Sequence, residues 1–154
     1  MNNPESDISF VPMQALAPTP QLYDELVGDS MEQLAQASLA QIPSLIAGTV
    51  IHDNGCGTGA GSGAIVESID EKAEITIKAT DINEKAIGMY QARATENGWP
   101  ATVSKMDALK LTFADHTFSH SIGNALIFVL PNDGIDAIKE MHRTLKPGGT
   151  RKLF

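Results

Sequence analysis

The sequence predicts an α/β protein with a doubly wound parallel sheet, in which helices cover both faces. From about residue 49 onward, short apolar segments alternate with segments of helical periodicity, and this rhythm is typical of strand–helix–strand units. A glycine-rich run directly follows the first apolar segment, which favours a sharp turn from a strand into a helix. A chain of 154 residues is long enough for one domain with its own core.

The N-terminal region departs from this alternation. Residues 1–21 hold four prolines and no sustained period, so we expect an irregular arm there. The helical pattern starts after this arm, and we expect the domain itself to occupy residues 22–154.

A capping signature and side-chain periodicity predict the individual elements. Ser30 followed by Gln33 resembles a capping box, which predicts a helix whose buried face includes Leu34, Ala37 and Ile42. Further along the chain, periodicity and turn residues predict four strands and three helices. The strands are expected at 49–52, 74–80, 102–105 and 118–122, and the helices from about residue 61, at 83–97 and at 133–145.

Composition narrows the partners and the compartment. The formal net charge is -8, and lysine and arginine are scattered, so we expect no nucleic-acid partner. A single cysteine, Cys56, permits no disulfide within the chain, which fits a reducing compartment. The N-terminal region lacks the pattern of a secretory signal, and no segment approaches the roughly 18 apolar residues of a membrane span. We therefore expect a soluble cytoplasmic protein that makes no membrane contact.

The glycine-rich run carries the most chemical information. Gly55 and Gly57 with Ala60 match the dinucleotide fingerprint G-x-G-x-x-A. Asp53, two residues before the first glycine, favours a different ligand, because its carboxylate would repel a pyrophosphate. The same carboxylate would attract the ammonium and sulfonium groups of S-adenosylmethionine. The helix that follows offers unpaired N–H groups to a ligand carboxylate.

This run resembles the D-x-G-x-G-x-G motif of class I S-adenosylmethionine-dependent methyltransferases, and most of all the small-molecule enzymes of fungal type. Asp53, Gly55, Gly57 and Gly59 stand in the signature places. The turn R-T-L-K-P-G-G at 143–149 also resembles the family pattern, and the matches extend over about residues 50–149. The resemblance implies a Rossmann-like fold and transfer of a methyl group to a small organic acceptor, with S-adenosylhomocysteine as the product.

The resemblance also implies a role for each strand end. In the family, the glycine loop wraps the methionine part of the cofactor, an acid such as Asp81 holds the ribose, and an acid such as Asp107 contacts the adenine. Asn124 follows the fourth strand, where the family often contacts the cofactor or the acceptor. No catalytic residue and no metal site are assigned. The candidate cofactor-binding residues are Asp53, Gly55, Cys56, Gly57, Gly59, Asp81, Ile82, Met106, Asp107, Ala108 and Asn124.

Structural roles remain open for several of these residues. The glycines could form only a tight turn, Asp81 could cap the helix expected at 83–97, and Asp107 or Asn124 could serve a turn. Cys56 is expected to fill space in the loop.

Residues outside the motifs have open roles as well. His52 is expected to be a hydrogen-bonded core residue, because it lies within a predicted strand. His116, His120 and His142 are possible bases for an O-methylation. Tyr23 either covers the cofactor as part of an N-terminal lid or packs in the core.

The sequence departs from the family at its C-terminal side. Family domains have seven strands, and the last two to three are absent here, so we expect an incomplete sheet. Arg151 and Lys152 make the last residues a poor central strand. The resulting open edge favours a homodimer or a companion chain. The alternative to an enzyme is therefore a catalytically incomplete cofactor-binding fragment, and a nicotinamide enzyme is a distant third.

Overall fold

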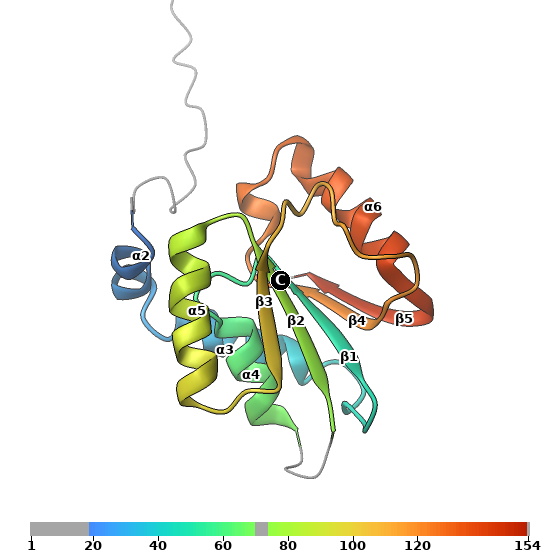
Figure 1. The fold of residues 1–154 in the computed structure, drawn as a ribbon, viewed down its shortest axis with the longest axis horizontal. Helices are drawn as coiled ribbons and strands as arrows, with labels where there is room; N and C mark the ends of the chain where they lie inside the picture. Colours follow the sequence, from blue (N-terminus) through green and yellow to red (C-terminus); the bar gives the residue numbers. More distant parts are fainter. Residues whose placement is uncertain (1–18, 70–73, 154) are drawn as a thin grey trace, which may run out of the picture.

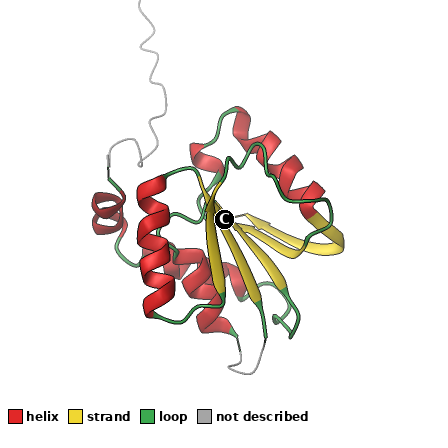
Figure 2. Ribbon diagram, in the orientation of Figure 1, coloured by secondary structure: helices red, strands yellow, loops and turns green. Residues whose placement is uncertain are grey.

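The computed structural model describes residues 19–69 and 74–153. They form one parallel five-stranded sheet with the strand order β3-β2-β1-β4-β5, flanked by helices on both faces (Figures 1 and 2). The predicted fold class is thus confirmed. The strands are β1 (Val50–Asn54), β2 (Thr76–Asp81), β3 (Ala101–Lys105), β4 (Phe118–Gly123) and β5 (Leu145–Leu153).

The helices cover the two faces unequally. α3, α4 and α5 lie on one face of the sheet, and α6 lies on the other (Figure 1). Two short 3-10 turns join β4 to α6. The helices are α2 (Pro20–Val27), α3 (Ser30–Leu39), α4 (Ala60–Ser68), α5 (Glu84–Glu96) and α6 (Ile135–Thr144).

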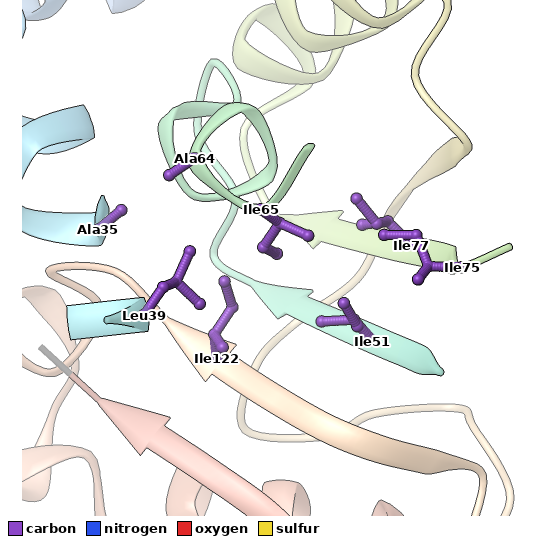
Figure 3. Packing of buried hydrophobic residues seen from close by; sticks show 8 residues of the cluster. All are labelled: Ala35, Leu39, Ile51, Ala64, Ile65, Ile75, Ile77 and Ile122. Carbon is purple, nitrogen blue, oxygen red and sulfur yellow. The ribbon is translucent and has the colours of Figure 1, made fainter. Parts of the chain in front are cut away.

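The main core lies between the sheet and the α3–α4 pair. Leu39 of α3 and Ile65 of α4 face Ile51, Ile77 and Ile122 of the three central strands (Figure 3). These side chains are at most 7% exposed. Burial of a large aliphatic side chain contributes about 1.5–3 kcal/mol, so this layer fixes the glycine-rich turn and α4 against the sheet.

The first helix begins earlier than the sequence pattern predicts. Thr19 caps α2, because its Oγ1 accepts a hydrogen bond from the Leu22 amide at 3.2 Å. Pro20 occupies the first helical turn, where the lack of an N–H group has no cost. Residues 1–18 of the expected arm lie outside the described residues, and the arm itself stays a prediction.

The predicted capping box of α3 is wrong. Asp29 is the N-cap residue, and Gln33 Nε2 donates a hydrogen bond to Asp29 Oδ2 at 2.6 Å. Ser30 is already inside the helix and its hydroxyl donates to the Val27 carbonyl at 2.5 Å. Because Gln33 can reach back to either residue, the sequence signature does not distinguish a cap at position 29 from one at position 30.

The buried face of α3 also differs from the prediction. Ala35, Ser38 and Leu39 are buried, whereas Leu34 and Ala37 are exposed. α3 packs closely against α4, and Ala35 of α3 lies in one buried cluster with Ala64 of α4. Close approach of two helices favours small residues at their contact, so the face with the bulkier Leu34 turns outward.

The fifth strand exists, although the sequence disfavours it. Leu145 pairs with Phe118, and after a register shift Thr150 pairs with His120. The predicted turn therefore forms an irregularity within β5, with Gly148 at a φ of +78°. Within the described residues no strand covers the outer edge of β5. The Arg151 side chain stays exposed, so β5 does not bury its charge.

Candidate functional site

A cavity of about 480 Å³ lies where the carboxyl ends of β1, β2, β3 and β4 meet. The strand order changes direction between β1 and β4, because β2 and β3 follow on one side of β1 whereas β4 and β5 lie on the other. Open α/β sheets bind ligands at such a switch point. Most of the candidate residues line this cavity: Gly55, Gly57, Asp81, Ile82, Met106, Asp107, Ala108 and Asn124. Asp53, Cys56 and Gly59 do not.

Gly55 and Gly57 shape the loop after β1 for different reasons. Both have positive φ values, +69° and +53°, which glycine adopts without strain. A Cβ atom on Gly55 would lie 2.5 Å from Leu126 Cδ1, so the missing side chain admits Leu126. A Cβ atom on Gly57 would meet no atom within 4 Å. Because Gly57 also lines the cavity, its bare backbone is open to a ligand.

Gly59 serves packing. It caps α4 with a φ of +102°, and a Cβ there would lie 2.9 Å from Trp99 Cζ3 and 3.1 Å from Tyr90 Cδ2. Trp99 in turn makes an edge contact with Tyr90, with ring centroids 5.8 Å apart. The third glycine of the motif therefore admits an aromatic pair, and the cofactor contact expected of it stays a prediction.

Cys56 fills space in the loop, as expected. Its side chain is 6% exposed and packs with Tyr90 and Ala79. Its amide donates a hydrogen bond to the Thr80 carbonyl at 2.9 Å, which ties the loop to β2. Burial raises the pKa of the thiol, so Cys56 is not an activated nucleophile.

Asp81 joins the glycine loop to the start of α5. Its Oδ2 accepts a hydrogen bond from the Gly57 amide at 2.8 Å, and its Oδ1 accepts from the Asn83 amide at 2.8 Å. The N-cap of α5 is Asn83, whose side chain accepts from the amide of Lys85, so Asp81 is not the cap. Each carboxylate oxygen can accept more than one hydrogen bond, and the Asp81 carboxylate borders the cavity.

The segment after β3 forms another wall of the cavity. The Met106 amide donates to the Asp81 carbonyl at 2.9 Å, and Asp107 Oδ1 accepts from the Leu109 amide at 2.8 Å. The turn role that remained open for Asp107 is thus present, and Asp107 also borders the cavity with Ala108. Ile82 is 63% exposed at the cavity rim.

Asn124 lines the cavity, and one of its two polar side-chain atoms is buried without a partner among the described residues. Its Nδ2 donates to the Met31 carbonyl of α3 at 3.1 Å, which fixes the orientation of the amide group. Its Oδ1 is buried and has no hydrogen-bond partner among the described residues. A buried polar atom without a partner is costly, so Asn124 retains unused acceptor capacity beside the cavity.

Asp53 lies beneath the loop. It is 0% exposed, and its Oδ2 accepts a hydrogen bond from the Ser62 hydroxyl at 2.6 Å. Burial raises the pKa of this carboxyl to about 6, although the hydrogen bonds from Ser62 oppose the shift. Asp53 does not line the cavity, and the attraction to the cofactor that the sequence predicts for its carboxylate stays a prediction.

None of the four histidines lines the cavity. His52 is the buried core residue that was expected: it is 0% exposed, its Nε2 lies 2.9 Å from Thr80 Oγ1, and burial lowers its pKa to about 3. His116 Nδ1 lies 2.9 Å from the Leu145 carbonyl oxygen, and His142 is exposed on α6. Burial also lowers the pKa of His120 in β4. The structure thus places no imidazole base at the site.

Two walls of the cavity were missed by sequence reasoning. Thr19 and Pro20 of the N-terminal region border it together with Tyr23, for which a lid position had been one alternative. Leu126, at 7% exposure, begins an apolar wall that extends through residues 129–131. The sequence signal for this wall is the apolar run at 125–130 directly after β4.

α2 is tied to the glycine loop by a side-chain contact. The Thr58 hydroxyl donates a hydrogen bond to Asp24 Oδ1 at 2.9 Å.

In the described part of the chain, no group of three or more histidine, cysteine or acidic side chains is arranged to hold a metal ion. No helix found there has the length and apolar character needed to cross a membrane.

Comparison with known proteins agrees with this geometry. Residues 51–149 match the family described as a methyltransferase domain. Demethylmenaquinone methyltransferase from Staphylococcus epidermidis is 35% identical over 95 residues, covering 61% of this chain and 37% of that protein. Methyltransferase tpcH from Aspergillus fumigatus is 31% identical over 105 residues, covering 66% and 36%.

A further relative is the ubiquinone/menaquinone biosynthesis C-methyltransferase UbiE from Neisseria meningitidis. It is 35% identical over 104 residues, which cover 67% of this chain and 41% of the enzyme. The chain thus spans less than half the length of the curated relatives it matches.

Solved structures show the same fold. A putative S-adenosyl-L-methionine-dependent methyltransferase from Methanococcus maripaludis superimposes with a TM-score of 0.72 at 15% identity, covering 91% of this chain and 63% of that one. The putative methyltransferase in complex with the Haloferax volcanii Trm112 activator gives a TM-score of 0.71 at 22% identity, with 84% and 54% covered. From the match over residues 51–149 and the strand-end cavity, the chain belongs to the class I S-adenosylmethionine-dependent methyltransferase family.

Proposed function

We propose that this chain binds S-adenosylmethionine in the cavity at the strand ends and supports methyl transfer to a small organic acceptor. The observation that carries the proposal is the convergence of Gly57, Asp81, Asp107 and Asn124 on one cavity. These residues stand at or just after the carboxyl ends of four different strands, so only the parallel sheet brings them together. The family match extends over the same strand ends.

Each wall of the cavity has a proposed part of the cofactor. The Asp81 carboxylate accepts hydrogen bonds from the ribose hydroxyls, because it borders the cavity and retains acceptor capacity. Asp107 contacts the adenine amino group, with Met106 and Ala108 against the ring. The methionine part lies along the bare backbone of Gly57, beside Asn124. The bound cofactor supplies an electrophilic methyl group.

The acceptor is proposed to be a small organic molecule. The names of two relatives place them in menaquinone or ubiquinone biosynthesis, and the apolar wall that begins at Leu126 suits such a molecule. Because no histidine lines the cavity, we propose that the chain accelerates transfer mainly by holding acceptor and methyl group in line.

A second candidate is a cofactor-binding fragment that acts as a homodimer or with a companion chain. The outer edge of β5, which no described strand covers, favours this alternative. In this case the acceptor site is completed by the second chain, and the cofactor binds without turnover.

The test is methyl transfer from S-adenosylmethionine with a labelled methyl group to a panel of phenols, quinols and amines. We expect label in at least one acceptor and an equal amount of S-adenosylhomocysteine, and loss of both in Asp81→Ala. Cofactor binding without transfer to any acceptor would favour the fragment. A folded chain that binds no S-adenosylmethionine would contradict both.

A further inference from the structure

Four polar side chains form a buried cluster on the central strands of the sheet. This polar cluster consists of His52 and Asn54 of β1, Thr80 of β2 and Ser121 of β4, each of which is 0% exposed. Ile51 packs against α4 in the main core (Figure 3), so strand alternation turns its neighbour His52 to the opposite face. Central parallel strands are normally apolar on both faces. Local exceptions to such patterning occur mainly at functional or strained sites.

Thr80 stands at the centre of the polar cluster. Its Oγ1 lies 2.9 Å from His52 Nε2 and 3.4 Å from Asn54 Oδ1. A threonine hydroxyl has one proton, which Asn54 Oδ1 accepts, so His52 Nε2 carries the proton that it donates to Thr80. The Nδ1 atom of this neutral ring is then an acceptor, and the Ser121 hydroxyl oxygen lies 3.5 Å from it. Thr80 thus joins β2 to both polar side chains of β1.

The polar cluster carries a cost in stability. Asn54 Nδ2 is buried and has no hydrogen-bond partner among the described residues, and an unsatisfied buried donor is costly. Burial also opposes the charged form of His52, since it lowers the pKa of the ring to about 3. An apolar side chain at position 54 would avoid the first of these costs. The polar cluster is therefore better explained by what it holds in place than by a contribution to folding.

Thr80 directly precedes Asp81, and both residues are tied to the glycine-rich loop. The Thr80 carbonyl accepts a hydrogen bond from the Cys56 amide at 2.9 Å, and Asp81 Oδ2 accepts one from the Gly57 amide at 2.8 Å. The Thr80 side chain adds a third tie, to the two polar side chains of β1 just ahead of that loop. Together these ties fix the end of β2 against the loop, and Asp81 borders the cavity at this end.

We infer that Thr80 is a positioning residue, whose hydroxyl sets, through His52 and Asn54, where the Asp81 carboxylate meets the ribose of the cofactor. This inference rests on the proposed function, in which Asp81 accepts hydrogen bonds from the ribose hydroxyls. Each Asp81 oxygen already accepts one amide hydrogen bond, so only the remaining lone pairs serve a ligand. A small displacement of the strand end would misalign them, because hydrogen bonds weaken steeply with poor angles. Thr80 does not line the cavity and acts only through Asp81.

The experiment compares two ligands, S-adenosylhomocysteine and its analogue without the 2′ and 3′ hydroxyl groups. Calorimetry gives both dissociation constants, and the ratio of the analogue's constant to the parent's measures how much the ribose hydroxyls contribute. In the wild-type chain we expect the analogue to bind more weakly. Thr80→Val keeps the shape of the side chain without its hydroxyl, and the ratio should fall by about tenfold, the effect of losing one hydrogen bond to a charged group. Thr80→Ser restores the hydroxyl and should restore the ratio.

A loss of stability alone would leave this ratio unchanged, because it lowers the folded fraction for both ligands alike. Ile65→Val is the control, since it removes a buried methyl group from the core on the other face of the sheet. This control should keep the wild-type ratio. If Thr80→Val does not fold, Thr80→Cys takes its place, because a thiol is readily buried and is only a weak donor and acceptor. The ratio should fall in this variant too.

The possible outcomes separate the inference from the proposed function. A folded Thr80→Val chain with the wild-type ratio would overturn the role of Thr80, as would a ratio that falls equally in Thr80→Ser. A wild-type chain that binds both ligands equally well would refute the ribose contact of Asp81, and the inference with it. A folded wild-type chain that binds neither ligand would contradict the proposed function itself.

Discussion

At the scale of single residues, two adjacent buried groups have pKa shifts of opposite sense. Burial raises the pKa of Asp53 to about 6 and lowers the pKa of His52 to about 3. The native state therefore keeps a proton on Asp53 that the unfolded state loses above pH 3.8, so stability falls as pH rises towards 6. The unfolded state holds a proton on His52 up to about pH 6.5, so stability rises with pH over the same range.

These two effects should nearly cancel in the wild-type chain between pH 4.5 and pH 5.5. Asp53→Asn removes the falling contribution, so the free energy of unfolding should rise with pH more steeply than in the wild type, by about 1 kcal/mol per pH unit. His52→Gln removes the rising contribution and should change the slope by a similar amount in the opposite sense. Urea unfolding at several pH values measures both slopes. Unchanged slopes in both variants would contradict the assigned burial.

The same pair shows where residue-level prediction from sequence succeeds. A histidine inside a predicted strand was expected in the core, and it is there. The position of Asp53 after the strand core also predicted closeness to the site. Sequence alone did not show that the carboxyl turns under α4, because this depends on Ser62 and on the space left by Gly61.

At the scale of elements, the β1–α4 turn uses its glycines for two purposes. Gly57 and Gly59 both have positive φ values, so alanine is strained at either position. Only at Gly59 would the new methyl group also collide with Trp99 and Tyr90. The pair therefore separates backbone strain from packing, with one substitution serving as the control for the other.

We expect Gly57→Ala to lower the free energy of unfolding by about 1–2 kcal/mol, the cost of left-handed backbone. Gly59→Ala should cost about 1–3 kcal/mol more, because overpacking is added. Cofactor affinity should fall in Gly57→Ala, whose methyl group enters the open side of the loop, and should survive in the folded fraction of Gly59→Ala. Denaturant unfolding and calorimetry measure the two effects. Equal losses of stability would contradict the packing role of Gly59.

Elements were predictable to different degrees. The four predicted strands are present because short apolar segments between turn residues have few alternatives. The face of α3 was not predictable, because it is decided by the contact with α4, in which Ala35 and Ala64 share one buried cluster. β5 formed despite Arg151, because this side chain stays exposed and donates a hydrogen bond to the Ile138 carbonyl at 3.5 Å.

At the scale of the whole molecule, parallel strand order explains why the site could be anticipated. Residues that directly follow β1, β2, β3 and β4 must meet at one edge of the sheet, so their positions along the chain suffice to bring them together. Two walls of the cavity, one formed by α2 and one that begins at Leu126, depend on how these parts of the chain fold back over that edge. Their placement comes from tertiary packing, for which the sequence carries only the apolar run at 125–130.

The open edge of β5 belongs to the same scale. If two copies pair along this edge, the chain should sediment as a dimer of about twice its 16.4 kDa mass, and the dimer should dissociate on dilution. Analytical ultracentrifugation over a range of concentrations measures this. A monomer at every concentration would contradict the homodimer.

The central claim is that the strand-end cavity holds S-adenosylmethionine, and calorimetric titration of the purified chain with this cofactor tests it most directly. We expect saturable binding that is lost in Asp81→Ala and retained in Asp136→Ala, an acid exposed on α6 away from the cavity. NAD should not bind in its place, because the Asp53 carboxylate beneath the loop disfavours a pyrophosphate. Equal binding in Asp81→Ala, or no binding by a folded wild-type chain, would contradict the claim.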